Sequence, residues 1–202
     1  MKHTIVAISR EFGSGGRTIG KELAARLGIS CYDSELLEKI AEKSGFTRDF
    51  VEKQGEESVG RGWLSQVFSA RDYRGRSSSQ DTLWAIQRKT ILELAEKESC
   101  VIVGRCADYI LRDREDCLRV FVHADPAVRA KRIVEQYGER EDSPEKRIRD
   151  KDKRRITYYQ FYTDLKWGDA HNYHITLDSV GIDRCVEILD GLCEGRKSEK
   201  QQ

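Results

Sequence analysis

The segment that decides the fold spans residues 4–27 and reads TIVAISREFGSGGRTIGKELAARL. It opens with the apolar run Ile5–Ile8, which predicts a buried parallel strand. A glycine-rich turn follows at residues 13–16, and apolar residues then recur every fourth position from Ile19 to Leu27, as on one face of a helix. Glycine allows backbone angles that other residues resist, and a helix N-terminus carries unpaired N–H groups. The order of strand, glycine turn and helix is therefore typical of a phosphate-binding loop.

This loop departs at two positions from the P-loop pattern G-x-x-x-x-G-K-[ST]. When Gly16 is taken as the second glycine, Glu11 stands at the first glycine and Arg17 at the lysine. Arginine is also cationic and can contact a phosphate at two points. Thr18 stands at the position of the hydroxyl that binds Mg²⁺. The spacing favours phosphate binding, and the alternative is a glycine-rich turn without a ligand.

Composition indicates a folded, strongly charged protein of one domain, or one domain with an insert. The chain has 202 residues, of which 35% are charged and 38% hydrophobic. The net charge of +1 does not favour nucleic acid or a membrane surface as a partner. There is no long apolar run, and strand residues begin at Thr4, so we expect no membrane span and no signal peptide. The six cysteines form no C-x-x-C pair, which favours reduced thiols in a cytoplasmic protein over a metal site.

Further strands and helices alternate along the chain. Apolar runs predict strands at residues 29–32, 100–103, 118–124 and 174–178. Periodicity and capping residues predict one helix that begins after Ser34 and ends near Gly45, and another that begins after Thr47. Further helices are predicted from Asp81 to about Glu98, around 107–111, from Asp125-Pro126 to Gly138, and over 182–193. This alternation predicts an α/β domain with a mostly parallel sheet.

Three stretches of the chain are polar and less regular. Residues 55–80 contain Arg71, Arg74 and Arg76, for which a solvated loop is favoured over phosphate contact. The charged stretch 139–155 is typical of a solvated helix face, and the tail from Glu194 is expected to be frayed.

Ligands of parallel sheets bind beyond the carboxyl ends of the strands. Four segments follow predicted strands directly: Gly13–Thr18, Asp33, Gly104-Arg105 and the residues after Asp125. Because three of the four carry charge at the end of a strand, we expect a ligand site there.

Five stretches carry a resemblance to a known family. They are ISREFGSGGRTIG (8–20), YDSELLEKIAEKSG (32–45), VIVGRCADYIL (101–111), HADPAVRAKRI (123–133) and DKDKRRITYYQFYT (150–163). On these stretches the chain resembles the nucleoside monophosphate kinases, and specifically the cytidylate kinase-like family of P-loop proteins. The resemblance implies a P-loop NTPase fold, with a five-stranded parallel sheet flanked by helices. It also implies a core of residues 1–33, 99–137 and 172–195, a helical insert at 34–98 that binds the nucleoside monophosphate, and a lid at 138–156.

The resemblance also implies roles for particular residues, with ATP and Mg²⁺ as cofactors and a nucleotide as substrate. The ATP phosphates would be held by Gly13, Ser14, Gly15, Gly16, Arg17 and Thr18, with Thr18 on Mg²⁺. The implied catalytic residues are Arg17, Asp33 and Arg132, and the implied acceptor-binding residues are Asp33, Lys39, Arg105, Asp152 and Arg155. Arg154 competes with Arg155 for its role.

The departures from the family pattern leave the acceptor open. Besides Glu11 and Arg17, Val103 stands where cytidylate kinases have an aspartate, and the sequence after the lid, ITYYQFYTDLKWGD, also differs. The first hypothesis is a kinase for a nucleoside monophosphate such as CMP or dCMP. The others are a P-loop kinase for another small metabolite and a nucleotide-binding regulator without turnover. For each single arginine, a surface ion pair is the alternative to phosphate binding.

Overall fold

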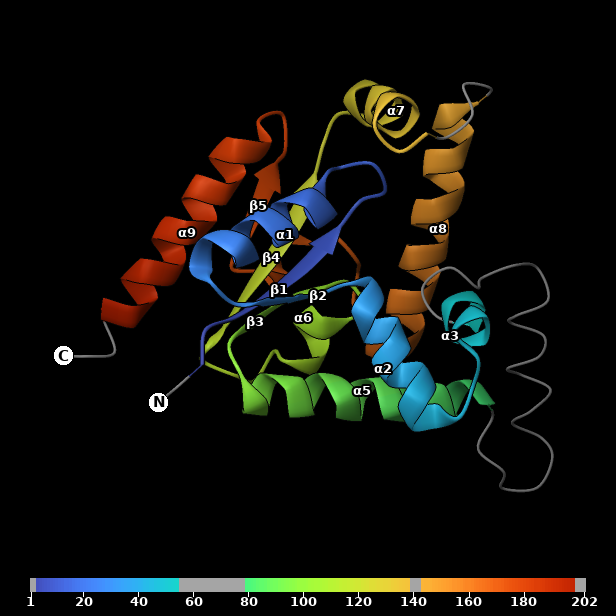
Figure 1. Cartoon of the computed structure of the whole chain (residues 1–202). Helices are drawn as coiled ribbons and strands as arrows, with labels where there is room; N and C mark the ends of the chain where they lie inside the picture. Colours follow the sequence, from blue (N-terminus) through green and yellow to red (C-terminus); the bar gives the residue numbers. More distant parts are fainter. Residues whose placement is uncertain (1–2, 55–78, 139–142, 199–202) are drawn as a thin grey trace.

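The computed structural model describes residues 3–54, 79–138 and 143–198, which form an α/β domain around one parallel sheet (Figure 1). The sheet has five strands in the order β2-β3-β1-β4-β5. Their bounds are β1 (Ile5–Arg10), β2 (Ser30–Tyr32), β3 (Cys100–Val103), β4 (Cys117–His123) and β5 (Ile175–Asp178). Every pair of neighbouring strands is parallel, so all five carboxyl ends lie at one edge. The predicted strands and the P-loop fold class are confirmed.

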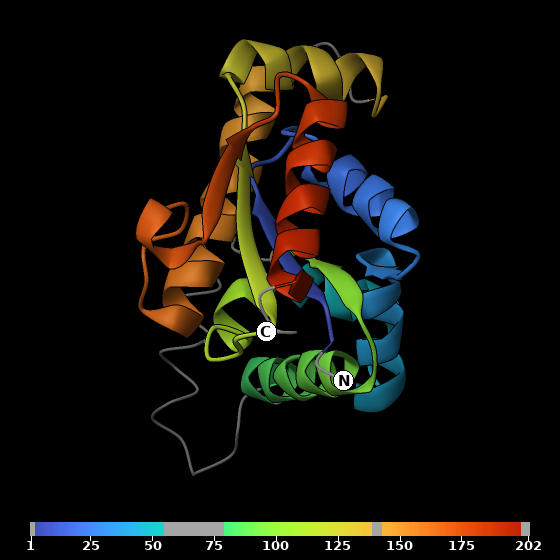
Figure 2. The same ribbon diagram turned by 90° about the vertical axis from the view of Figure 1, so that its left-hand side faces the viewer.

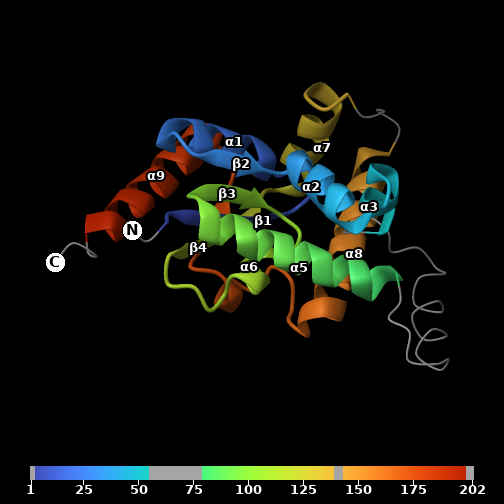
Figure 3. The ribbon, with the colours of Figure 1, turned by 60° about the horizontal axis from the view of Figure 1, so that its bottom comes forward.

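Helices cover both faces of the sheet (Figure 3). On one face lie α1 (Gly16–Leu27) and α9 (Ile182–Ser198), which pack against each other (Figure 2). On the other face lie α2 (Ser34–Ser44), α3 (Arg48–Gln54), α5 (Ser79–Lys97) and α6 (Ala107–Ile110). The helices α7 (Pro126–Glu135) and α8 (Pro144–Thr163) pack together, and a short 3₁₀ turn, η1 (Ala170–Asn172), precedes β5.

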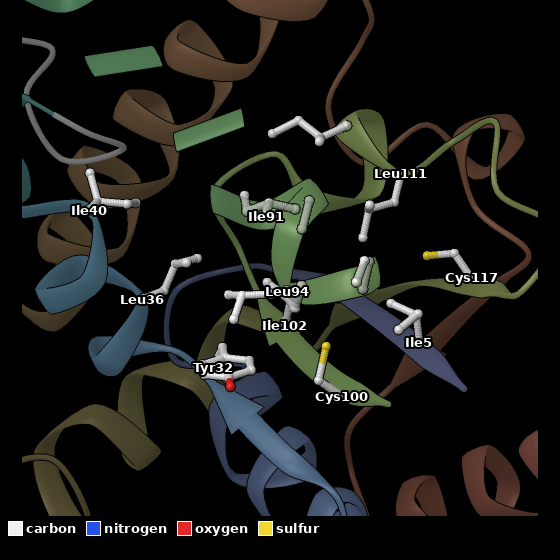
Figure 4. Close-up of a cluster of buried hydrophobic side chains, with 14 of the residues drawn as sticks. Ile5, Tyr32, Leu36, Ile40, Ile91, Leu94, Cys100, Ile102, Leu111 and Cys117 are labelled. Carbon is white, nitrogen blue, oxygen red and sulfur yellow. The ribbon is translucent and has the colours of Figure 1, made fainter. Parts of the chain in front are cut away.

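The core has two apolar halves, one on each face of the sheet. Ile5 and Ala7 of β1 face α2, α5 and α6, whereas Val6 and Ile8 face α1 and α9. This alternation follows from the two-residue repeat of a strand. Ile91 of α5 is fully buried in the first half, which Figure 4 shows.

Local signals set several helix ends as predicted. The Asp125 carboxylate accepts a hydrogen bond from the Ala127 N–H at 2.8 Å, and Pro126 occupies the first turn of α7. Helix α2 ends at Gly45, which has φ +70°. Thr47 Oγ1 accepts from the Phe50 N–H at 3.2 Å at the start of α3.

Other boundaries differ from the prediction. Helix α5 begins at Ser79, so Asp81 lies within its first turn instead of capping it. Helix α7 ends at Glu135, before Gly138, and α9 continues to Ser198 where a frayed tail was expected. Boundaries of this kind depend on packing that local patterns do not report. Residues 55–78, with Arg71, Arg74 and Arg76, and residues 139–142 of the expected lid lie outside the described residues.

The charged stretch before residue 155 is not only a solvated face. Its residues 144–155 form the first half of α8, in which Ile148, Lys151 and Arg155 are buried. Helix α8 packs on α7, and its second half buries Tyr158 and Tyr159 in an aromatic cluster. In the described parts of the chain, no helix has the length and apolar character that crossing a membrane requires.

Replacing Ile91 by alanine should lower the free energy of unfolding by about 2–5 kcal/mol, because it leaves a cavity in the core. The matched control is Val180→Ala, since Val180 is 74% exposed, and its change should stay within about 0.5 kcal/mol. Urea titration of both variants measures the two values. An Ile91→Ala effect as small as that of the control would contradict the described packing.

Candidate functional site

A cavity of about 490 Å³ lies where the strands β1, β2 and β3 end. It is lined by Arg10, Glu11, Phe12, Gly13, Gly15, Gly16, Arg17, Asp33, Ser34, Leu37, Arg48, Glu52, Arg105, Tyr137 and Arg155. Five of these residues are arginines and three carry carboxylates, an excess of two positive charges. Such a lining favours a ligand with several negative charges.

The glycine loop between β1 and α1 packs tightly against the helices behind it. Gly13 and Gly15 have φ values of +78° and +82°, which residues with a Cβ rarely adopt. A Cβ on Gly13 would lie 2.8 Å from Ile133 Cγ2, and a Cβ on Gly15 would lie 2.5 Å from Ile182 Cδ1. These two glycines are therefore required both by the turn and by the close approach of α7 and α9.

Arg17 and Asp33, two predicted site residues, meet at the cavity. Arg17 Nε lies 2.5 Å from Asp33 Oδ2; the Arg17 side chain is 61% exposed, whereas that of Asp33 is 7% exposed. Asp33 Oδ2 is buried, and the Arg17 guanidinium is its charged partner. Asp33 follows β2 directly and precedes α2, so the sheet edge brings its carboxylate to the loop.

Arg105, another predicted residue, lines the cavity from a left-handed turn after β3. Gly104, Arg105 and Cys106 have φ values of +76°, +58° and +54°. For residues other than glycine this conformation costs about 1–3 kcal/mol each and persists only where the surroundings enforce it. Gln87 Nε2 of α5 donates to the Arg105 carbonyl at 3.0 Å and to the Tyr158 hydroxyl at 3.3 Å.

Gln87 was not among the predicted site residues. The signal for it was a polar residue on the apolar face of α5, where Leu83 and Leu94 are also buried. A buried amide needs hydrogen-bond partners, and Gln87 finds them at the turn that carries Arg105.

Arg155 lies at the cavity as predicted. Its Nη1 donates to the Arg10 carbonyl at 3.1 Å, and its guanidinium lies 5.6 Å from the centroid of the Phe12 ring. These contacts place it between the end of β1 and the glycine loop, although it comes from α8.

Asp152 and Arg132 do not line the cavity but contact the backbone of the loop, and their contact with a nucleotide stays a prediction. Asp152 Oδ1 accepts from the Phe12 N–H at 2.8 Å. Arg132 Nη1 donates to the Gly13 carbonyl at 2.9 Å, and its Nη2 donates to the Ser179 carbonyl at 3.0 Å. Helices α7 and α8 pack against the loop, so these side chains bind loop backbone.

Lys39 is also outside the cavity lining, and its contact with the acceptor phosphate stays a prediction. Its Nζ lies 5.6 Å from the centroid of the Tyr32 ring. The cation that lines the cavity from the helices after β2 is Arg48 of α3, which the sequence analysis missed. Arg48 Nη1 donates to Glu38 Oε1 at 2.8 Å on the surface.

The remaining loop residues, Ser14 and Thr18, are not part of the lining. The Ser14 hydroxyl is fully buried and donates to the Glu11 carbonyl at 2.9 Å, so it stabilises the turn. Among the described residues, no group of three or more His, Cys, Asp or Glu side chains is arranged to hold a metal. Mg²⁺ commonly takes one or two protein ligands with substrate phosphates and water, and the Thr18 hydroxyl and the Asp33 carboxylate fit that smaller set.

Cys31 lies next to this site in the sequence but is not a nucleophile. Burial, with the nearby carboxylates of Asp33 and Glu35, raises the pKa of its thiol to about 11. A thiol with this pKa stays protonated near neutral pH and is therefore unreactive. All six cysteines are free in the structure.

The sheet order, the glycine loop and the arginine-lined cavity place the chain among P-loop proteins with a kinase fold. A model of the cytidylate kinase-like family matches residues 5–180. The chain belongs to the cytidylate kinase-like family.

Two relatives cover almost the whole chain. A cytidylate kinase from Archaeoglobus fulgidus is 27% identical in an alignment of 203 positions that covers 98% of each chain. The crystal structure of an uncharacterized protein from Eubacterium ventriosum covers 95% of this chain and 99% of its own, with 29% identity and a TM-score of 0.71. A shikimate kinase from Bacteroides thetaiotaomicron covers 95% of this chain and 98% of its own, with 18% identity and a TM-score of 0.54, and shares the fold alone.

Replacing Gly13 by alanine should destabilise the protein by about 2–4 kcal/mol, through backbone strain and a clash with Ile133. Gly28→Ala is the matched control, because Gly28 has φ +65° but no atom lies within 4 Å of the place that a Cβ would take there. It should cost about 1–2 kcal/mol, from strain alone. Urea unfolding of both variants gives the difference, and equal losses would show that the close approach of α7 to the loop is not enforced.

Proposed function

We propose that this protein transfers the γ-phosphoryl group of ATP to a small phosphorylated acceptor, with a nucleoside monophosphate such as CMP or dCMP as the first candidate. The observation that carries this proposal is the cavity, which joins the glycine loop to Arg105, Arg155 and Arg48. Phosphoryl transfer depends on positioning and charge neutralisation more than on covalent chemistry, and a cavity rich in arginine suits both requirements.

On the donor side, the loop residues Gly13–Thr18 bind the ATP phosphates. Backbone N–H groups at the start of α1 face an anion favourably, and Arg17 adds a cation at the lysine position. Mg²⁺, held by Thr18, Asp33 and the phosphates, would neutralise charge on the transferred group. Arg17 is largely exposed and paired with Asp33 in the structure, so it must turn from the carboxylate to reach a phosphate.

On the acceptor side, Arg105 and Arg155 bind the acceptor phosphate and Arg48 assists from α3. Arginine can give a phosphate two parallel hydrogen bonds, which fixes its orientation. Arg105 is held by a rigid turn, so its side chain starts from a fixed backbone position. In this proposal residues 34–98 form the acceptor-binding insert, and residues 138–156, which include Arg155, form the lid.

A second candidate is a kinase that phosphorylates a hydroxyl of another small metabolite. The observation in its favour is Asp33, whose buried carboxylate lies beside the loop at the cavity and pairs with Arg17. A carboxylate in that position can accept the proton of an attacking hydroxyl. The third possibility is nucleotide binding without turnover, which the altered residues Glu11 and Arg17 motivate.

Release of ADP, measured by a coupled assay over a panel of acceptors, separates the three. The panel contains CMP, dCMP, UMP and AMP, the corresponding nucleosides, and small hydroxy acids, with ATP and Mg²⁺ present throughout. Turnover with a monophosphate but not with its nucleoside supports the first proposal. Preference for an uncharged alcohol or a hydroxy acid would replace it with the second, and binding of ATP without turnover on any acceptor would leave the third.

Replacing Arg105 by alanine should lower kcat/KM for the acceptor by about tenfold to a hundredfold, the effect of losing hydrogen bonds to a charged group. The affinity for ATP should change by less than about twofold. Arg112→Ala is the control, because Arg112 stacks on Tyr109 at 4.0 Å outside the cavity. Steady-state kinetics with both substrates measures kcat/KM for the acceptor, and calorimetry measures the affinity for ATP. Equal losses toward ATP and acceptor would remove Arg105 from the acceptor side.

A further inference from the structure

The glycine loop is held at Phe12 by Arg129 and Asp152, and Glu11, which also lines the cavity, pairs with Arg129. We name these three charged side chains the loop clamp. The Phe12 N–H donates to Asp152 Oδ1 at 2.8 Å, and the Phe12 carbonyl accepts from Arg129 Nε at 2.8 Å. The same guanidinium donates to Glu11 Oε2 at 3.0 Å and pairs with Asp152 Oδ2. The Arg129 side chain is only 5% exposed, so both carboxylates neutralise a buried cation.

The next two carbonyls of the loop are also bound from outside. Arg132, one helical turn after Arg129 on α7, donates to the Gly13 carbonyl at 2.9 Å. The Ser179 hydroxyl, after β5, donates to the Ser14 carbonyl. Three successive carbonyls therefore point away from the cavity toward side chains of other elements.

These outer contacts determine where the inner N–H groups point. In a trans peptide the carbonyl and the following N–H point in opposite directions, and the described chain has no cis peptide. Because the carbonyls of Phe12 and Ser14 are held outward, the N–H groups of Gly13 and Gly15 point to the other side. Both glycines line the cavity. The side chains that bind the loop carbonyls therefore orient the N–H groups that can bind an anion in the cavity.

We propose that Glu11, Arg129 and Asp152 are positioning residues that orient the phosphate-binding amides, and that Glu11 replaces the usual first glycine because Arg129 requires its carboxylate. This inference rests on the ATP site of the proposed function and adds to it the residues that set the geometry of the loop. The competing explanation is that the clamp only stabilises the fold. The two differ in what the variants do to ATP binding once each variant is folded.

Glu11→Gly is the decisive variant, because it restores the glycine of the usual pattern and removes the carboxylate. It should weaken Mg-ATP binding by about tenfold or more, since the buried guanidinium loses a charged partner and the Phe12 peptide loses its fixed orientation. Glu11→Gln keeps an acceptor oxygen and should lose less. Lys131→Ala is the control. Lys131 lies on the same helix as Arg129, is 72% exposed and is not part of the clamp, so this variant should bind Mg-ATP as the wild type does.

Calorimetry with Mg-ATP below the unfolding transition of each variant measures these affinities, and the KM of the acceptor is measured alongside. A positioning role predicts a weaker affinity for ATP with an unchanged KM for the acceptor. A parallel loss in both, or a change only in unfolding temperature, would mean that the clamp is merely structural and would overturn the proposal.

Hydrogen exchange of the ligand-free protein gives a readout that needs no activity. The Phe12 amide should exchange faster in Asp152→Ala than in the wild type, and close to the wild-type rate in Asp152→Asn, which keeps the accepting oxygen. Unchanged protection of Phe12 in Asp152→Ala would overturn the clamp.

The proposal of the loop clamp and the proposed function can be rejected independently of each other. If the wild type turns over an acceptor and Glu11→Gly binds Mg-ATP equally well, the clamp is overturned and the function stands. If the wild type binds Mg-ATP, the clamp variants lose that affinity, and no acceptor is phosphorylated, the function is overturned and the clamp stands.

Discussion

The central place of β1 in the sheet is the constraint on which the site depends. β1 pairs with β3 on one side and β4 on the other, and five of its six residues are buried. The glycine loop follows directly, so it starts from the central strand of the sheet. β2 and β3 end at the same edge, which is why Asp33 and Arg105, distant in sequence, reach one cavity with the loop.

Four buried arginines then divide between the two sides of that loop. Arg105, Arg129, Arg132 and Arg155 are 7%, 4%, 8% and 8% exposed. A buried guanidinium is stable only with partners that satisfy its charge and its hydrogen bonds. Arg129 and Arg132 find theirs in carboxylates and loop carbonyls. Arg155, which lines the cavity with Arg105, donates to the Arg10 carbonyl. The outer pair supports the loop, and the inner pair adds positive charge where an anionic ligand would fit.

The parts of the fold that local rules determine could be predicted from the sequence. The apolar runs indicated the strands, and Asp125, Pro126 and Gly45 marked helix ends through their own backbone chemistry. Arg17, Asp33, Arg105 and the glycines reached the cavity because each follows a strand. The sequence could not predict in this way that Arg48, and not Lys39, lines the cavity. This depends on how α2 and α3 pack against the sheet.

The placement of Asp152 and Arg132 shows a different limit. A motif indicates which residue types stay near a phosphate loop, but not on which side of the loop they lie. Judged by itself, Glu11 is a defect in the P-loop pattern, because a glycine is missing. In the structure Glu11 pairs with Arg129, a residue that the loop sequence alone does not connect with it. A departure from a motif is thus best evaluated together with the distant residue that contacts it, since Glu11 Oε2 lies 3.0 Å from Nη1 of the buried Arg129.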